Sequence, residues 1–419
     1  MRTRSATQMS KVSGEKSARC SSDSLMRLGS VRDVVLARVP LEAHRALGQA
    51  CKALRRLVYS DGFAKLRKTL GCEEFGLLLL AGSVFSNAEG TEGRRKQLVC
   101  LTHNLESLGF AAVGECPLDM CEFTAALSTD GRLVVCGDAN WGRKGDRKVL
   151  VYDTRQHVWV RDSRYPAILP VIMFGQCTAF LDNTLVVVGG GTDDEDEPWG
   201  FSWDEHLRMW QSLPPVPTAV THPAYGVIGS RLFVVGGYSC DVAHTEHYGG
   251  DGMCDYSARL QIFDATTQSW SLGPPLTQLQ ERLEFPTSSV AYENRFYVFC
   301  QRALDHGSDD NPRSILASSP CHVYCFDPLS NSWSELPAVP TIDSLSDLQA
   351  CLHDGRLIVA GMKNFDPENA GFFEAEPSTY MYEWDDRAET WKEQPLLLDV
   401  RAWPAGRLAS LVSVPLRIR

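Results

Sequence analysis

Residues that can hold a metal ion gather in one segment, where Cys240, His244, His247 and Cys254 fall within fifteen positions. Two thiolates and two imidazoles are a ligand set that a structural zinc ion takes. Successive ligands are separated by three, two and six residues, and this spacing matches no short-hairpin zinc pattern. We therefore expect no metal and no cofactor.

Residue patterns typical of catalysis are absent from the sequence. It shows no Ser/His/Asp spacing, no phosphate-binding loop and no paired general acid and base. The acidic run at 193–197 is either a solvated loop or a docking site for a basic partner. We therefore expect that the chain is not an enzyme and that its functional residues are ones that bind a partner.

Charge divides the chain into two parts. Residues 1–72 hold 15 basic and 5 acidic side chains, whereas the rest holds 26 basic and 47 acidic ones, a net charge of −21. Such an acidic part repels a phosphate backbone, so we expect no nucleic-acid partner. No apolar run approaches a membrane span of about 18–20 residues, so we also expect no membrane.

The cysteines and the N-terminal residues indicate the cellular compartment of the protein. The 14 cysteines contain no Cys-x-x-Cys pair and no apolar secretion signal follows Met1, which is typical of free thiols in a reducing compartment. Cys136, Cys177 and Cys325 lie in apolar patterns and are expected to be small buried side chains. We predict a cytoplasmic location, a nuclear one, or both.

Residues 1–24 are rich in serine and poor in large apolar side chains. They can bury too little surface to offset the entropy of ordering, so a disordered tail is expected. A Ser/Arg-rich, acid-poor start also resembles an organelle transit peptide, which stays open as the alternative.

A repeat governs the chain after residue 75. An aromatic-Asp pair recurs with Trp seven residues after the aromatic, and a weaker copy is His103-Asn104 with Phe110. Hydrophobic runs that end in small residues precede each copy, and most follow a turn signal such as Asp130-Gly131. The five full copies begin at Tyr152, Trp203, Phe263, Phe326 and Trp384, with tryptophans at Trp159, Trp210, Trp270, Trp333 and Trp391.

Each unit of about 50–60 residues therefore predicts four short strands, which is a propeller blade. Because a four-stranded sheet with two apolar faces cannot bury them alone, the blades must stack in a ring, with the tryptophans between neighbours. The first unit begins at its second strand, 77–82, and a spare strand occupies 408–414. We predict that these two pair and close a ring of six blades.

The hydrophobic run, Gly-Gly, aromatic-Asp and spaced Trp resemble kelch repeats, with six copies over 73–419. The fold class is then mainly β, a six-bladed kelch-type propeller. In such blades the long connections, from second to third strand and from fourth strand to the next blade, emerge on one face, where function usually lies. Aromatic and arginine side chains on those connections suit protein recognition. The predicted substrate-binding face contains Trp141, Arg143, Trp199, Tyr238, His244, His247, Tyr248, Arg282, Arg302, His306, Phe365, Arg401 and Trp403.

Residues 31–70 show helical periodicity, with apolar positions three and four residues apart from Leu47 to Val58 and a break at Ser60-Asp61-Gly62. We predict that residues 25–72 form a small module of three short helices, whose thin core a partner would help to stabilise. Its residues from Arg38-Val39-Pro40 to Leu70-Gly71 resemble an F-box, although Leu-Pro is missing from its opening.

An F-box before kelch repeats implies a non-catalytic substrate receptor of an SCF-type E3 ubiquitin ligase. The module would dock on a Skp-type adaptor of a cullin complex, and the propeller would hold an unidentified target protein. A kelch scaffold without ubiquitin chemistry stays open, as does a propeller enzyme, for which the Glu-x3-Asp-x3-His run of iron-dependent specifier proteins is missing. The predicted adaptor contacts are Val34, Val35, Leu36, Arg38, Val39, Pro40, Leu47, Leu54 and Arg55.

Overall fold

The computed structural model divides the chain into two compact units, Met1–Glu74 with Arg417–Arg419, and Phe75–Leu416. Each unit is described by itself below. The structure describes residues 30–39, 47, 49–58, 60–70, 75–82, 97–102, 109–115, 122–138, 147–154, 158–171, 173, 175–190, 200–239, 257–282, 284–302, 321–340, 348–353, 355–362, 379–394 and 407–415.

The first unit contains helices α2 (Ser30–Ala37), α4 (Lys52–Val58) and α5 (Asp61–Thr69). The predicted break is confirmed, because the Ser60 hydroxyl accepts a hydrogen bond from the Phe63 N–H and caps α5. From α5, the buried Arg67 side chain donates to the carbonyls of Ala37 (2.8 Å) and Val39 (2.7 Å). It thereby satisfies carbonyl groups at the end of α2 that the helix leaves unpaired.

No helix in the described part of the chain is long and apolar enough to span a membrane.

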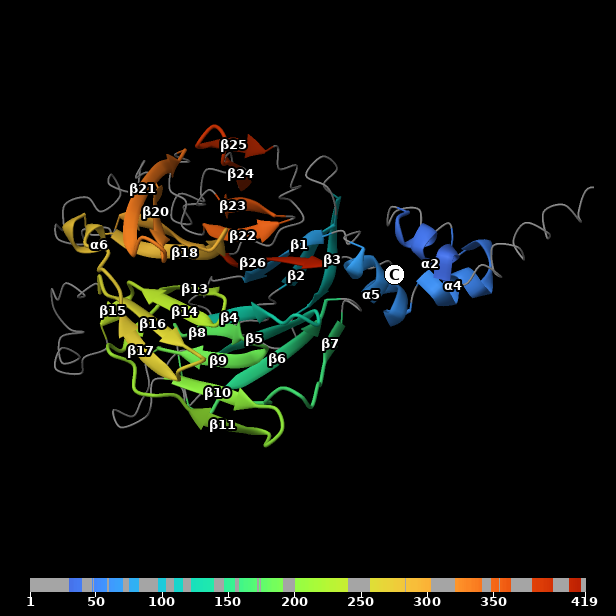
Figure 1. The fold of residues 1–419 in the computed structure, drawn as a ribbon, viewed down its shortest axis with the longest axis horizontal. Coiled ribbons are helices and arrows are strands. Elements are labelled where there is room, and N and C mark those ends of the chain that lie inside the picture. The colour runs from blue at the N-terminus through green and yellow to red at the C-terminus, as the bar shows by residue number, and fades with distance from the viewer. Residues whose placement is uncertain are drawn as a thin grey trace, which may run out of the picture. The chain divides into compact units, whose positions relative to one another are not determined.

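Within its described residues, the second unit contains six four-stranded antiparallel sheets and one two-stranded sheet, and Figure 1 shows how they are arranged. The first has the order β26-β1-β2-β3: β1 (Phe75–Gly82), β2 (Gln97–Thr102), β3 (Gly109–Glu115) and β26 (Arg407–Pro415). The second contains β4 (Glu122–Leu127), β5 (Arg132–Asp138), β6 (Lys148–Asp153) and β7 (Val158–Val160). The third contains β8 (Cys177–Leu181), β9 (Thr184–Val188), β10 (Gly200–Asp204) and β11 (Met209–Ser212).

The remaining sheets follow the same meander. The fourth contains β13 (Ala224–Ile228), β14 (Arg231–Val235), β16 (Leu260–Asp264) and β17 (Ser269–Leu272). The fifth follows the short helix α6 (Gln278–Glu281) and contains β18 (Glu284–Tyr292), β19 (Arg295–Arg302), β20 (Cys321–Asp327) and β21 (Ser332–Val339). The sixth contains β22 (Gln349–His353), β23 (Arg356–Met362), β24 (Thr379–Asp385) and β25 (Thr390–Gln394), and the small sheet pairs β12 (Val220–Thr221) with β15 (Tyr238–Ser239).

The innermost strands contact one another in succession, from β4 through β8, β13 and β18 to β22, and β26 contacts both β22 and β4. The predicted mainly β propeller is confirmed in the second to sixth sheets, which are described with their side chains. The predicted pairing of the C-terminal strand with the first repeat is also confirmed, because β26 pairs with β1. Six complete blades stay a prediction, since the first sheet is described by its strands and register alone.

The repeat motif follows from the geometry of the two outer strands. The motif aspartate accepts hydrogen bonds from N–H groups of the turn, as Asp264 does from Thr266 (2.8 Å), which confirms its predicted turn role. The motif aromatic and the tryptophan are directly opposed across the strands. The pairs are Tyr152–Trp159, Trp203–Trp210, Phe263–Trp270, Phe326–Trp333 and Trp384–Trp391, with ring centroids 5.0–5.5 Å apart.

The tryptophans also join neighbouring sheets, as predicted. In four of the five repeats the indole N–H donates to a carbonyl near or beyond the end of the preceding sheet's outermost strand, whereas Trp159 Nε1 is buried without a partner among the described residues. The bonds run from Trp210 to Ile168, Trp270 to Pro214, Trp333 to Pro274 and Trp391 to Pro337, at 2.9–3.0 Å. Trp391 is buried, whereas the other three are half-buried. Truncation of Trp210 or Trp270 should therefore expose less apolar surface than truncation of Trp391.

An ion-pair network on the second sheet predicts an acid-sensitive contribution to stability. Arg164 Nη2 lies 2.6 Å from Asp162 Oδ2, and this hydrogen bond lowers the pKa of Asp162 to about 2. The ionised carboxylate thus stabilises the folded chain above about pH 4, and that stability is lost as pH falls toward about 2. Because Arg164 is partly exposed, we expect Asp162→Asn to cost only about 1 kcal/mol at about pH 7. Urea titrations should show about half of that cost at about pH 3, and an equal cost at both pH values would contradict the role of the ion pair.

Candidate recognition face

The predicted binding face lies where the connections enter and leave the inner strands, and the fifth sheet shows its construction best. Arg282 stands between α6 and β18, and Glu284 begins β18. The register pairs Glu284 with Arg302 and Cys300 with His322, so the start of β18, the end of β19 and the start of β20 lie together. The two long connections of this sheet therefore emerge at one edge, as expected.

Five side chains from three strands and the α6 connection form a polar cluster there, called the Arg282 cluster below. Arg282 binds Glu335 through both terminal nitrogens, with Nη1–Oε1 at 2.8 Å and Nη2–Oε2 at 3.0 Å. Arg282 Nη1 also lies 2.9 Å from His322 Nδ1 and donates to the Tyr324 hydroxyl at 3.1 Å. The Tyr324 hydroxyl in turn donates to Oε2 of Glu284 (2.8 Å).

The charges of the cluster are arranged from the interior outward. The Glu284 side chain is only 3% exposed, whereas Glu335 and Arg282 are 39% and 40% exposed. Hydrogen bonding from Arg282 holds the pKa of Glu335 below its usual range. Burial and the hydrogen bond to Glu284 raise the pKa of Tyr324, so this hydroxyl remains a donor at neutral pH. The cluster is therefore ion-paired, with Arg282 toward the solvent.

The corresponding place in the fourth sheet is closed by different chemistry. Gln261 of β16 is buried and accepts from the Thr218 N–H (2.7 Å) while donating to the Thr218 carbonyl (3.0 Å). An amide and a backbone segment thus satisfy one another, and the incoming connection is fixed to the sheet. In the fifth sheet Tyr324 occupies this repeat position, two residues before the motif aromatic, and Arg282 replaces the backbone partner.

Of the predicted face residues, Arg282, Tyr238 and Arg302 lie among the described residues. Tyr238 on β15 pairs with Thr221, is half-buried, and packs edge-on against His222 with ring centroids 6.1 Å apart. Arg302 is described by its backbone only, at the end of β19. The structure does not bring Tyr238 and Arg282 together. The others lie outside the described residues: Trp141, Arg143, Trp199, His244, His247, Tyr248, His306, Phe365, Arg401 and Trp403.

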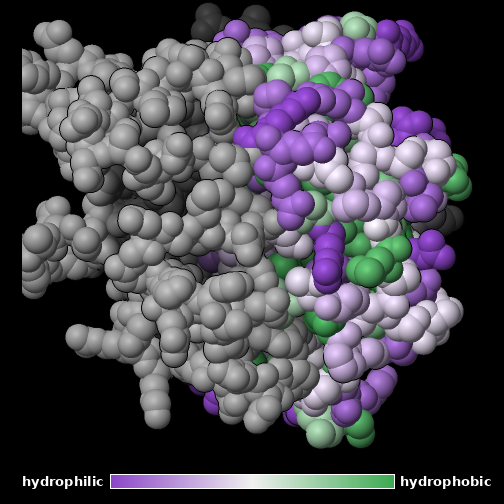
Figure 2. All heavy atoms as spheres, turned by 90° about the vertical axis from the view of Figure 1, so that its left-hand side faces the viewer, coloured by the Kyte–Doolittle hydropathy of each residue, from purple (hydrophilic) through white to green (hydrophobic). Residues whose placement is uncertain are grey.

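His322, Tyr324, Glu284 and Glu335 were missed by sequence reasoning. They stand on strands rather than on long connections, and no local spacing joins them. The only signal is the polar side chain two residues before the motif aromatic, at Gln261 and Tyr324. Figure 2, which views the side where α6 and β15 lie, shows a mainly hydrophilic described surface with small hydrophobic areas. Charged recognition suits such a surface better than a broad apolar contact.

The described residues contain no group of three or more His, Cys, Asp or Glu side chains placed to hold a metal ion. Cys240, His244, His247 and Cys254, like the acidic run at 193–197, lie outside that part of the chain. The predicted burial of Cys136, Cys177 and Cys325 is confirmed. Burial raises the pKa of Cys136 to about 12, so this thiol is not a reactive nucleophile.

Of the predicted adaptor contacts, only Pro40 lies outside the described residues. Val35 on α2 is 58% exposed, with Val34 and Leu36 half-buried beside it, while Val39 follows the helix. Leu47 and Leu54 are half-buried, and Arg38 and Arg55 are exposed.

Comparison with known proteins connects this propeller to a family. Residues 219–277 and 285–340, which span the fourth and fifth sheets, match the Kelch motif. Kelch-like protein 35 of Mus musculus is 25% identical over 187 residues, covering 42% of this chain and 26% of that protein. Kelch repeat and BTB domain-containing protein 2 of cowpox virus is 20% identical over 275 residues, covering 62% and 44%. An F-box/kelch-repeat protein of Arabidopsis thaliana is 24% identical over 211 residues, covering 48% and 51%.

The chain thus spans between about a quarter and a half of the length of these relatives. A solved structure titled "Structure of YjhT" covers 66% of this chain and 84% of its own, at 16% identity and a TM-score of 0.48. The Kelch match over the fourth and fifth sheets agrees with the register of aromatic, aspartate and tryptophan described above. The chain therefore has a mainly β propeller of the kelch type, whose fourth and fifth sheets match the Kelch motif.

Proposed function

We propose that this chain is a non-catalytic substrate receptor of an SCF-type E3 ubiquitin ligase. The helical unit docks a Skp-type adaptor of the cullin complex, and the propeller binds a target protein. The observation that carries the proposal is a separate unit of short helices joined to a kelch-repeat propeller in one chain. The Arabidopsis relative, named as an F-box/kelch-repeat protein, supports this arrangement.

The adaptor-binding surface of the proposal is the end of α2. Val35 is exposed beside the half-buried Val34 and Leu36, and Arg67 fixes the end of the helix from α5. An apolar side chain held on a rigid helix end is the kind of anchor that a partner's pocket takes. The basic side chains of residues 25–72 would speed the encounter with an acidic partner.

Capture of a purified Skp-type adaptor by the immobilised full-length chain tests this role. We expect the unmodified chain to capture the adaptor and Val35→Asp to weaken capture about tenfold or more, because it buries a charge in an apolar contact. Leu207→Asp is the matched control, since it changes an equally exposed apolar side chain of the propeller. If the unmodified chain captures no adaptor, the ubiquitin role is wrong.

A kelch scaffold without ubiquitin chemistry is the second candidate. It is favoured by the family comparison, in which the Kelch motif matches the propeller while no F-box is detected. The same capture experiment separates the two, because a scaffold binds its target without binding an adaptor. The closed six-bladed ring and a cytoplasmic or nuclear location also belong to the proposal, supported by the contacts of β26 and by the free described cysteines.

A further inference from the structure

The Arg282 cluster leaves one edge of a guanidinium unused. Glu335 occupies the end of the guanidinium between Nη1 and Nη2, and His322 with Tyr324 occupies the remaining side of Nη1. The Nε–H and the second Nη2–H of Arg282 meet no acceptor among the described residues. These two N–H groups form a parallel fork that fits the two oxygens of a carboxylate.

The guanidinium of Arg282 is also held in one orientation, unlike that of an ordinary exposed arginine. Three partners on two strands fix the guanidinium plane, so little rotamer entropy remains to be lost when a further group binds. Arg282 is 40% exposed although both of its other edges are covered. The fork is therefore the part of the guanidinium that solvent, or a bound protein, can reach.

His322 helps to hold the guanidinium in place. Arg282 Nη1 can only donate, so His322 Nδ1 accepts from it, and the ring proton lies on Nε2, 3.9 Å from Glu284 Oε1.

We propose that Arg282 anchors a carboxylate side chain of the bound target protein through its Nε–H and Nη2–H fork. The inference rests on the proposed function for the presence of a target protein. The carboxylate site itself does not depend on the adaptor. The corresponding site of the fourth sheet offers no such fork, because Gln261 and Thr218 use their donors on one another.

Arginine side-chain NMR of the full-length chain tests the proposal with acetate as the probe. Acetate replaces chloride at constant ionic strength. The Nε–H resonance of Arg282, assigned with Arg282→Lys, should shift and saturate, because acetate binds the Nε–H and Nη2–H fork.

Arg231 is the matched control in the same spectrum. It is 55% exposed, but its Nε already donates to Asp264 Oδ2 at 3.0 Å, so its resonance should not follow acetate. A shift at Arg282 that is absent, or no larger than that at Arg231, overturns the carboxylate site. Acetate binding without adaptor capture would refute the ligase role and leave this site standing.

Discussion

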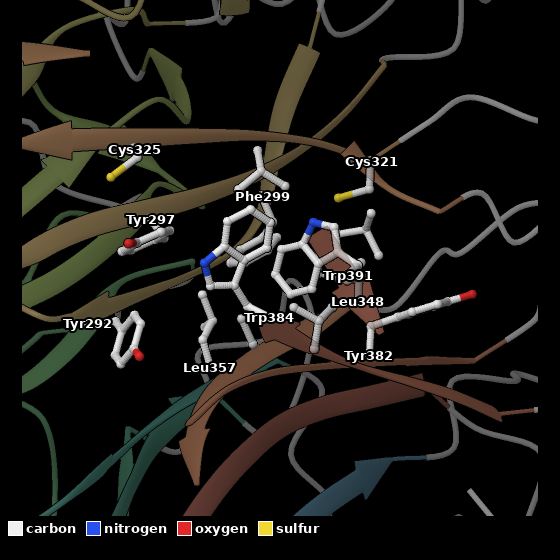
Figure 3. Packing of buried hydrophobic residues seen from close by; sticks show 14 residues of the cluster. Tyr292, Tyr297, Phe299, Cys321, Cys325, Leu348, Leu357, Tyr382, Trp384 and Trp391 are labelled. Carbon is white, nitrogen blue, oxygen red and sulfur yellow. The ribbon is translucent and has the colours of Figure 1, made fainter. Parts of the chain in front are cut away.

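Trp391→Ala is expected to lower the free energy of unfolding by about 3–5 kcal/mol, the range for truncating a large buried aromatic. Trp391 is 6% exposed and packs with Trp384 and Phe299 between the fifth and sixth sheets (Figure 3). Its indole N–H also donates to the Pro337 carbonyl at 2.9 Å, which ties β25 to the end of β21. The substitution removes the packing and the hydrogen bond together.

Urea titration with and without the substitution measures this loss. Trp210→Ala is the matched control, because Trp210 occupies the same repeat position and makes the same kind of hydrogen bond, to Ile168, but is half-buried. We expect about half the loss there, since less apolar surface is exposed to water on truncation. Equal losses in both variants would mean that the hydrogen bond, and not burial between the sheets, stabilises the propeller.

The blades were predictable because their determinants are local. Alternation, turn signals and a fixed motif spacing lie within each unit, and the turns formed as expected: Asp182-Asn183 and Glu293-Asn294 both adopt positive φ. The pairing of β26 with β1 followed from one missing and one spare strand. Both inferences need only the periods of a strand and of the repeat.

The predicted alignment of the first repeat with the other five was wrong at one position. His103 was aligned with the motif aromatics, but the register pairs Phe110 with Leu101. Without a tryptophan at the second position, the spacing of seven residues no longer fixes which residues face each other. The exposed fraction of each tryptophan could not be predicted from the sequence either, because it depends on how far the neighbouring sheet extends over each ring.

The candidate site was only partly predictable. Arg282 was found because it lies on a long connection before an inner strand. Glu284, His322 and Glu335 join it only through the register of four strands, and a register places residues together that no spacing in the sequence relates. A functional site whose residues come together only through strand pairing therefore cannot be predicted from spacings along the sequence.

Gly237→Ala is expected to cost about 3 kcal/mol, because two separate penalties meet at this position. Gly237 has φ +84, a left-handed conformation that side chains with a Cβ rarely adopt, and an added Cβ would clash with the Thr221 carbonyl oxygen. This close approach lets β15 pair with β12, which positions Tyr238 on the recognition face.

Gly229→Ala separates the two penalties. Gly229 also has positive φ, +59, but an added Cβ there meets no atom within 4 Å, so only the conformational cost of about 1 kcal/mol is expected. Thermal and urea unfolding of the two variants should differ by about 2 kcal/mol. If they differ by less than about 0.5 kcal/mol, the chain at Thr221 yields to the added methyl group. The glycine would then serve only the turn, and the second Gly of the repeat would not be needed to bring β12 and β15 together.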